Sequence, residues 1–251
     1  MLLLASAALA FQVSTGHPSH NSTGAARQGA LEATDTPGTG PTGTGRAPAP
    51  GPTGPTGTPG PRVPRSGNGD FVTAAAVVGP TGTGPDVGYA VMVEDGSGLD
   101  AEAAAREIAA ILADPRGWAA HGRGRFRQTD PSSADLVIKI ATPVTADRLC
   151  AAYGLDTGGE LNCETPGGVV VNLLRWQTGS PQFDGTPQEY RPLIVNHEVG
   201  HYIGLSQHLD CPGPGLPAPV MMQQIKGLHG CRSNAWPYDE YGAYLDGPPA
   251  A

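Results

Sequence analysis

The sequence predicts an α+β fold in a single folded domain at residues 67–251. Two β-branched runs flank a Gly/Pro loop, short apolar runs follow, and two later segments repeat apolar residues at helical spacing. A stretch with almost no apolar side chains precedes this region. The chain has 251 residues, so the part after that stretch is long enough to bury one hydrophobic core.

The first 66 residues are expected to lie outside the domain. Met1–Phe11 is apolar and has the length of a signal-peptide core, but no basic residue precedes it. We interpret residues 1–16 as a signal or a truncated anchor, which predicts a protein that is secreted or held at the membrane by this segment. Between Pro37 and Pro61, 22 of 25 residues are Gly, Pro or Thr, so residues 17–66 are predicted to be a disordered linker, suited to tether the domain to a membrane or cell wall.

The first predicted strands are Phe71–Val78 and Tyr89–Val93, and both are rich in β-branched and apolar residues. The Gly-Pro-Thr-Gly segment at Gly79–Gly82 lies between them. We expect an antiparallel pair with this segment as the hairpin loop.

A helix is predicted at Ala101–Ala113. Asp100 is suited to cap its start, apolar residues recur inside it at helical spacing, and Asp114 with Pro115 ends it. Leu136–Ala141 and Val169–Leu173 are predicted strands.

The last predicted helix lies between Pro187 and Gly204. Pro192 is placed in its first turn, where a missing N–H costs nothing. Apolar residues follow at helical positions: Leu193, Ile194, Val195, Val199 and Ile203. Gly204 can adopt the left-handed backbone that ends a helix and turns the chain.

Charge and cysteine content narrow the class of protein. The net charge is −8 and the pI is near 5.2, which argues against nucleic acid as a partner. The four cysteines favour two disulfides in an exported protein, and three connectivities are possible. Sequential pairing is the connectivity that closes short loops. If the protein is not exported, reduced cysteines are expected instead. The residues concerned are Cys150, Cys163, Cys211 and Cys231.

The residues with the clearest chemical signal lie at the end of the last helix. His197 and His201 are four residues apart, so on a helix both rings project from one face and can bind one metal ion. Glu198 lies beside the first histidine, where its carboxylate can reach a water on the metal. A helix with two surface histidines is the alternative reading.

These residues resemble the metzincin metallopeptidases, whose pattern is HExxHxxGxxH followed by a methionine turn. His197, Glu198, His201 and Gly204 match the pattern, and Pro219–Met222 is a candidate methionine turn, with Met221 or Met222 beneath the metal. The resemblance implies a single metzincin-like zinc-peptidase domain with a mixed sheet and an active-site helix, binding Zn²⁺.

The third ligand departs from the pattern. The expected position holds Gln207, and a histidine follows one residue later at His208. We expect His208 to be the ligand because imidazole binds zinc better than a carboxamide. Asp210 is the alternative, and His229 is a more distant one.

A second resemblance covers about residues 63–237. Four segments are similar to an actinobacterial family of secreted metzincin-like domains of unknown function: Ala113–Trp118, Asp147–Cys150, Asn196–His201 and Cys211–Cys231. It implies the fold and the metal, but no substrate.

The predicted function is therefore that of a secreted, monomeric zinc peptidase that cleaves protein or peptide substrates, with Glu198 as general base. Two alternatives remain open. One is an inactive zinc-binding or cell-wall-binding module, and the other is a zinc hydrolase acting on cell-wall peptides. The three tryptophans are expected to lie in the core rather than in a substrate groove.

Overall fold

The computed structural model describes residues 62–75 and 79–250. The chain divides into two units, Met1–Pro55 and Thr56–Ala251, and the described residues belong to the second. The predicted signal or anchor at residues 1–16 and most of the predicted linker lie outside the described residues. Val63 already packs against the core, so the packed chain starts a few residues before residue 67.

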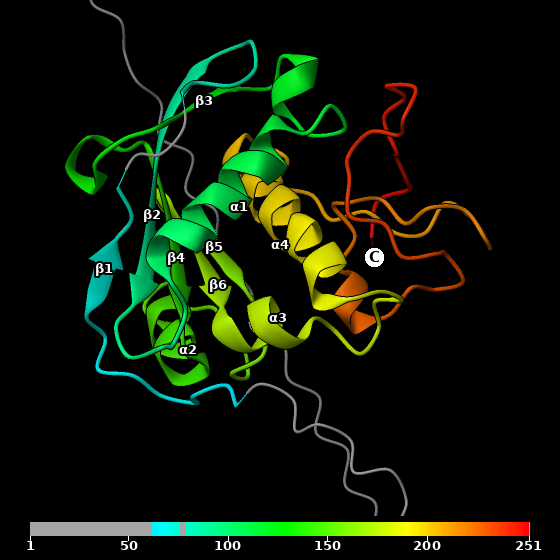
Figure 1. Cartoon of the computed structure of the whole chain (residues 1–251). Helices are drawn as coiled ribbons and strands as arrows, with labels where there is room; N and C mark the ends of the chain where they lie inside the picture. The colour runs from blue at the N-terminus through cyan, green and yellow to red at the C-terminus, as the bar shows by residue number, and fades with distance from the viewer. Residues whose placement is uncertain (1–61, 76–78, 251) are drawn as a thin grey trace, which may run out of the picture. The chain divides into compact units, whose positions relative to one another are not determined.

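The described part is an α+β structure built on one mixed sheet, with the strand order β1-β2-β4-β6-β5 and with β3 beside β2 (Figure 1). β2, β3, β4 and β6 are parallel, whereas β1 and β5 run antiparallel to their neighbours. The strands are Phe71–Thr73 (β1), Asp86–Glu94 (β2), Arg125–Gln128 (β3), Leu136–Ala141 (β4), Cys163–Thr165 (β5) and Gly168–Asn172 (β6).

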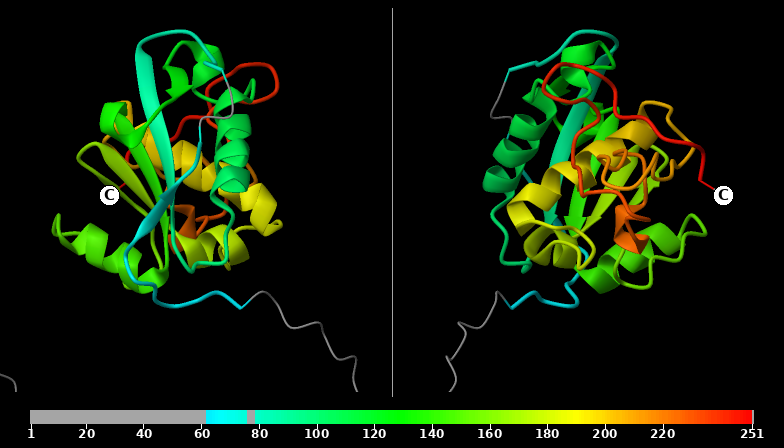
Figure 2. Two further views of the ribbon diagram at one scale, coloured as in Figure 1. Left: turned by 60° about the vertical axis from the view of Figure 1, so that its left-hand side comes forward. Right: turned by 90° about the vertical axis from the view of Figure 1, so that its right-hand side faces the viewer.

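Helices lie on both faces of the sheet, so central-strand residues are buried on both sides, although Lys139 of β4 is only partly buried on the second face. In β6, Val169 and Val171 face the main core, whereas Val170 faces a smaller cluster on the other side. The α-helices are Ala101–Ala113 (α1), Pro143–Ala151 (α2), Leu173–Thr178 (α3) and Pro187–Tyr202 (α4). α1 and α4 lie together on one face, and α2 lies on the opposite face (Figure 2).

Several predicted elements are confirmed. Asp100 caps α1 by accepting a hydrogen bond from the Ala103 N–H, and the helix ends before Asp114. β4 has the predicted bounds. β1 and β2 form the predicted antiparallel pair, with Phe71 opposite Glu94, but β1 ends at Thr73 and the last three residues of the predicted strand lie outside the described part of the chain. Trp118 and Trp176 are buried in the core, and Trp236 packs against it.

Other expectations need correction. Within the Gly79–Gly82 segment, Thr81 forms an antiparallel bridge with Phe126 of β3. This segment therefore pairs with β3 and does not close a tight hairpin between β1 and β2. The predicted strand at Val169–Leu173 is β6, but Leu173 already begins α3 because the Asn172 side chain caps that helix. The sequence reading also missed α2, whose central residues show little apolar periodicity.

The start of α4 differs from the prediction as well. Thr186 and Glu189 form a reciprocal capping box, so the helix begins at Pro187 and Pro192 lies inside it. Proline in a helix interior leaves the carbonyl four residues earlier without its N–H partner. That carbonyl belongs to the exposed Gln188, where solvent can hydrogen-bond to it. The strong cap therefore determines the start of the helix.

The four cysteines form two disulfides, Cys150–Cys163 and Cys211–Cys231, and this is the sequential pairing. The first joins α2 to β5, and the second closes the loop after α4. Such bonds are typical of extracellular proteins. None of the helices in the described part of the chain has the length and hydropathy that crossing a bilayer requires.

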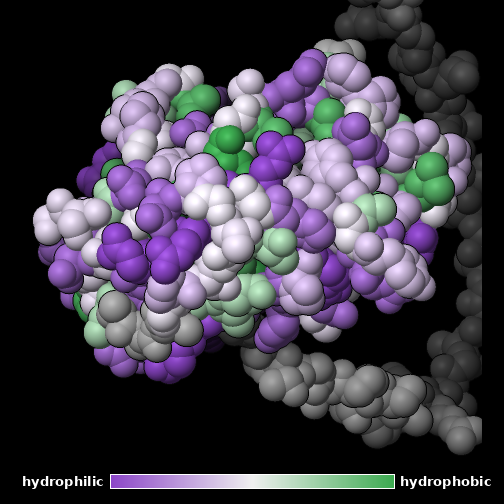
Figure 3. Space-filling model, turned by 90° about the horizontal axis from the view of Figure 1, so that it is seen from above, coloured by the Kyte–Doolittle hydropathy of each residue, from purple (hydrophilic) through white to green (hydrophobic). Residues whose placement is uncertain are grey.

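The chain after α4 is mostly irregular and lies beside that helix (Figures 1 and 2). The face seen from above carries apolar side chains in small groups among polar ones (Figure 3). The predicted metal ligands lie where this irregular chain meets α4: His197 and His201 belong to the helix, and His208 belongs to the chain after it.

Candidate metal centre

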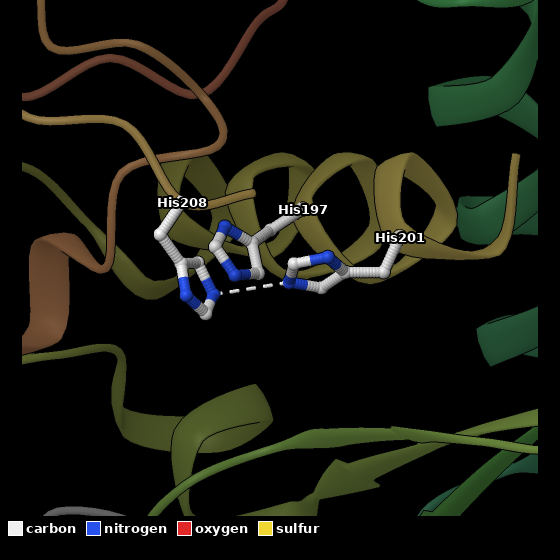
Figure 4. Close-up of side chains that lie close together, drawn as sticks. All are labelled: His197, His201 and His208. Carbon is white, nitrogen blue, oxygen red and sulfur yellow. Dashed lines mark hydrogen bonds between the residues drawn. The ribbon is translucent and has the colours of Figure 1, made fainter. Parts of the chain in front are cut away.

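Three histidines converge at the end of α4 (Figure 4). His197 and His201 project from successive turns of the helix, and His208 approaches them from the loop that follows. Gly204 has a φ of 99°, in the left-handed region that glycine tolerates, so the chain can turn back toward the helix there. Local helix geometry therefore positions two rings, and the turn supplies the third.

The ring nitrogens are close enough to share one ion. The Nε2 atoms of His201 and His208 are 3.1 Å apart, and the candidate ligand atoms of all three residues lie within 4.8 Å of one another. A tetrahedral zinc ion with bonds of 2.0–2.1 Å places its nitrogen ligands about 3.3 Å apart. Small rotations of the rings would bring these histidines to that spacing.

Hydrogen bonds to the backbone orient two of the rings. His197 Nδ1 lies 2.8 Å from the Val220 carbonyl oxygen, and His201 Nδ1 lies 2.9 Å from that of Leu205. Because a carbonyl only accepts, each Nδ1 must carry a proton, and in the neutral ring the lone pair is on Nε2. Partners of this kind are what orient histidine ligands in metal sites.

The protonation state of His197 and His208 also suits metal binding. Burial, together with the neighbouring His201, lowers the pKa of His197 to about 3. Burial and His201 lower the pKa of His208 as well. Neutral imidazole is the form that binds a metal, so the donors present fit a zinc ion.

Glu198 lies next to His197 and is 6% exposed. Burial, with a contribution from the charge of Glu164, raises the pKa of Glu198 to about 8. Its carboxylate has no hydrogen-bond partner among the described residues and borders the cavities beside the histidines. The carboxyl group is therefore available for proton transfer.

A cleft of about 440 Å³ opens over this centre. One wall comes from β5 and the segment before it, and the opposite wall comes from the loop after residue 222. The cleft is lined by Glu198 and the three histidines together with Leu155, Asp156, Thr157, Leu161, Asn162, Cys163, Glu164, Ser206, Gln223 and Lys226.

The predicted methionine turn lies directly beneath the helix. Met222 N–H donates to the Pro219 carbonyl at 3.0 Å, which closes the turn, and Met221 is 1% exposed. A Cβ on Gly200 would overlap the Met221 sulfur, so this glycine allows α4 to pack onto the turn. The same turn presents the carbonyl that holds His197.

The alternative third ligands lie elsewhere. Asp210 and His229 pair with each other, with Oδ1 and Nδ1 2.6 Å apart, and neither belongs to the histidine cluster. Gln207 does not line the cleft. Among the described residues, the one group of three side chains suited to a metal is His197, His201 and His208.

Sequence reasoning missed the segment that holds His208 in place. The His208 carbonyl accepts from the Ala250 N–H at 2.9 Å, and the Asp210 N–H donates to the Pro248 carbonyl at 2.7 Å. Leu209 N–H donates to the Met221 carbonyl at 3.1 Å. The first two bonds join positions about 40 residues apart and the third joins positions 12 apart, and no local sequence pattern predicts them.

The described unit is thus an α+β domain whose cleft contains three convergent histidines and a buried glutamate. The chain belongs to the family described as protein of unknown function (DUF3152), which matches residues 57–239. No curated protein and no solved structure gives a match.

Proposed function

We propose that this protein is a secreted, zinc-dependent peptidase. The observation that supports it best is the convergence of His197, His201 and His208 beside Glu198 in one cleft. We also propose that the domain is metzincin-like, because helix, glycine turn, third histidine and methionine turn follow in the order of that pattern.

The chain's own residues divide the work. The three histidines would hold the ion through ring nitrogens, and a bound zinc would supply Lewis acidity to the scissile carbonyl and to the attacking water. Glu198 takes a proton from the attacking water and delivers it to the leaving amine nitrogen. A cation nearby favours the carboxylate form of Glu198, which is the form a base needs.

The cleft is suited to an extended peptide. β5 is an edge strand that pairs only with β6 among the described strands, so its outer edge can bind a peptide backbone. A smaller cavity of about 60 Å³ adjoins His197 and Glu198 and is lined by apolar residues that include Leu193, Ile194 and Met222. It fits a small apolar side chain of the substrate.

The test combines metal content and hydrolysis. We expect one zinc per wild-type chain and per Asp210→Ala chain, and much weaker zinc binding by His208→Ala. Glu198→Gln should keep zinc but lose hydrolysis of a peptide library by at least about 100-fold. Unchanged cleavage by Glu198→Gln, or a wild-type protein that stays metal-free in excess zinc, would overturn the proposal.

One other function has an observation in its favour. The third histidine comes one residue later than the metzincin pattern places it, as expected of a zinc-binding or cell-wall-binding module without activity. Zinc bound by the wild type, without any Glu198-dependent cleavage, would favour this module over a peptidase.

A further inference from the structure

Gln223 lines three cavities that are also lined by histidines of the cluster. These are the main cleft of about 440 Å³, the cavity of about 60 Å³ beside Glu198, and a third cavity of about 200 Å³ next to His208. It directly follows the methionine turn, whose backbone holds His197. A substrate bond lying over the metal centre would therefore lie close to Gln223.

The orientation of the Gln223 amide follows from its neighbour. Lys226 Nζ lies 2.9 Å from the Gln223 amide, and an ammonium group only donates hydrogen bonds. The atom it contacts must be Oε1, so the NH₂ group is the end left over. That NH₂ group has no partner among the described residues.

The next residue shows the contrast. Gln224 is 2% exposed, and its amide donates to the Pro219 and Asn234 carbonyls and accepts from the Asn234 N–H. Its amide nitrogen and its amide oxygen are therefore both engaged within the fold. Gln224 fixes the backbone on one side of Gln223, while the donor of Gln223 remains available to a ligand.

We propose that Gln223 is a further catalytic residue that donates a hydrogen bond to the carbonyl oxygen of the scissile bond, and that Lys226 is its positioning residue. This rests on the proposed peptidase function. When water attacks the carbonyl carbon, the C=O electron pair moves to the oxygen, and the water proton moves to Glu198. Gln223 forms no covalent bond; its N–H stabilises the charge that develops on that oxygen.

The alternative donor is Asn162 on the opposite wall. Asn162 also lines the cleft, and its Oδ1 accepts from the Asn172 N–H at 2.9 Å, so its NH₂ group is the end left over. Asn162 does not line the cavity next to His208, whereas Gln223 does. Alanine substitution distinguishes the two residues, because only the variant that lacks the true donor should lose kcat.

The first experiment measures kcat and KM for a cleaved peptide. Gln223→Ala should lower kcat about 100-fold, with a smaller change in KM and unchanged zinc content. Lys226→Met should lower kcat about tenfold, and Lys226→Arg should restore it, because arginine also only donates. Gln188→Ala, an exposed change in the first turn of α4, is the control and should behave as wild type.

The second experiment needs no hydrolysis. A phosphinic peptide carries a tetrahedral anionic centre, and zinc-loaded Gln223→Ala should bind it about 100-fold more weakly than wild type does. The corresponding peptide with a planar amide is measured on the zinc-loaded Glu198→Gln variant, which does not cleave it. Adding Gln223→Ala to this variant should reduce the affinity for the planar peptide much less than 100-fold.

Equal phosphinic affinities for wild type and Gln223→Ala would overturn the inference, as would a wild type that binds no phosphinic peptide. A kcat loss in Asn162→Ala without one in Gln223→Ala would also overturn it. If Glu198→Gln is inactive and Gln223→Ala is fully active, the peptidase stands and this inference is wrong. If Glu198→Gln still cleaves, the peptidase mechanism is wrong, while the phosphinic measurement still decides the role of Gln223.

Discussion

Glu94 joins three segments through one carboxylate. Its Oε1 accepts hydrogen bonds from the Gly69 N–H at 2.9 Å and the Thr145 hydroxyl at 2.7 Å, and its Oε2 accepts from the Thr142 N–H at 2.7 Å. The side chain is 1% exposed. Burial alone would raise the pKa of Glu94, but hydrogen bonds from Thr145, Thr142 and Gly69 outweigh it and lower the pKa below 4.5.

We expect Glu94→Gln to lower the free energy of unfolding by about 1–3 kcal/mol at pH 7, because one carboxylate oxygen becomes an NH₂ group that faces a donor. The folded state has the lower pKa, so this stabilisation is present above about pH 4.5 and is lost as the pH falls through the folded-state value. Urea unfolding should show that the difference in the free energy of unfolding between wild type and variant is smaller in acid than at pH 7. Glu240→Gln, at an exposed position, is the control, and a gap that widens in acid would contradict the assignment.

At the scale of elements, the third histidine depends on a pairing between two loops. The segment 208–210 lies between the methionine turn and residues 248–250, and hydrogen bonds join it to both. A Cβ on Gly247 would overlap the Asp210 carbonyl oxygen, so this pairing requires glycine there. Among the residues that the structure describes, none forms a hydrogen bond with His208 Nδ1, in contrast to the other two histidines.

Gly247→Ala should therefore displace the backbone that carries His208 and weaken zinc binding about 10- to 100-fold, the effect usual for supporting residues of metal sites. Competition with a chelator measures the affinity, and thermal unfolding of the metal-free protein shows whether the fold survives. Gly79→Ala is the matched control because its Cβ would meet no atom within 4 Å. Equal zinc affinity in both variants would show that residues 247–250 do not support the site.

At the scale of the whole described unit, each disulfide braces one wall of the cleft. Cys150–Cys163 attaches β5 to α2 behind the sheet, and Cys211–Cys231 closes the loop that contains Pro219–Met222. The loops span 13 and 20 residues. Loops of this length correspond to about 3 kcal/mol of stabilisation in the chain-entropy description.

Replacing Cys211 and Cys231 together by alanine should lower the free energy of unfolding by about 3 kcal/mol, since the unfolded chain regains the freedom of that loop. Urea unfolding under non-reducing conditions measures the change. The Cys150 and Cys163 double variant serves for comparison and should lose a similar amount. Stability equal to wild type in both double variants would mean that the disulfides do not contribute in this way.

Much of the fold could be predicted because its signals are local. α1 follows from an aspartate cap and apolar spacing, and β4 follows from a short apolar run. α4 was predicted with a wrong start, because the Thr186 capping box outweighed the usual preference of a proline for the first turn. α2 was missed because its apolar periodicity is weak.

The sequence by itself determined the pair His197 and His201, with Glu198 beside them, because helical spacing alone puts two residues four apart on one face. Only the tertiary structure showed that His208, and not Asp210 or His229, lies beside that pair, and only it revealed the positions of Gln223 and Glu94. Those residues meet through contacts between distant segments, whose register depends on how the sheet, α4 and the irregular chain after it pack together. Local sequence patterns do not predict that packing, because they reflect only residues that are near one another in the chain.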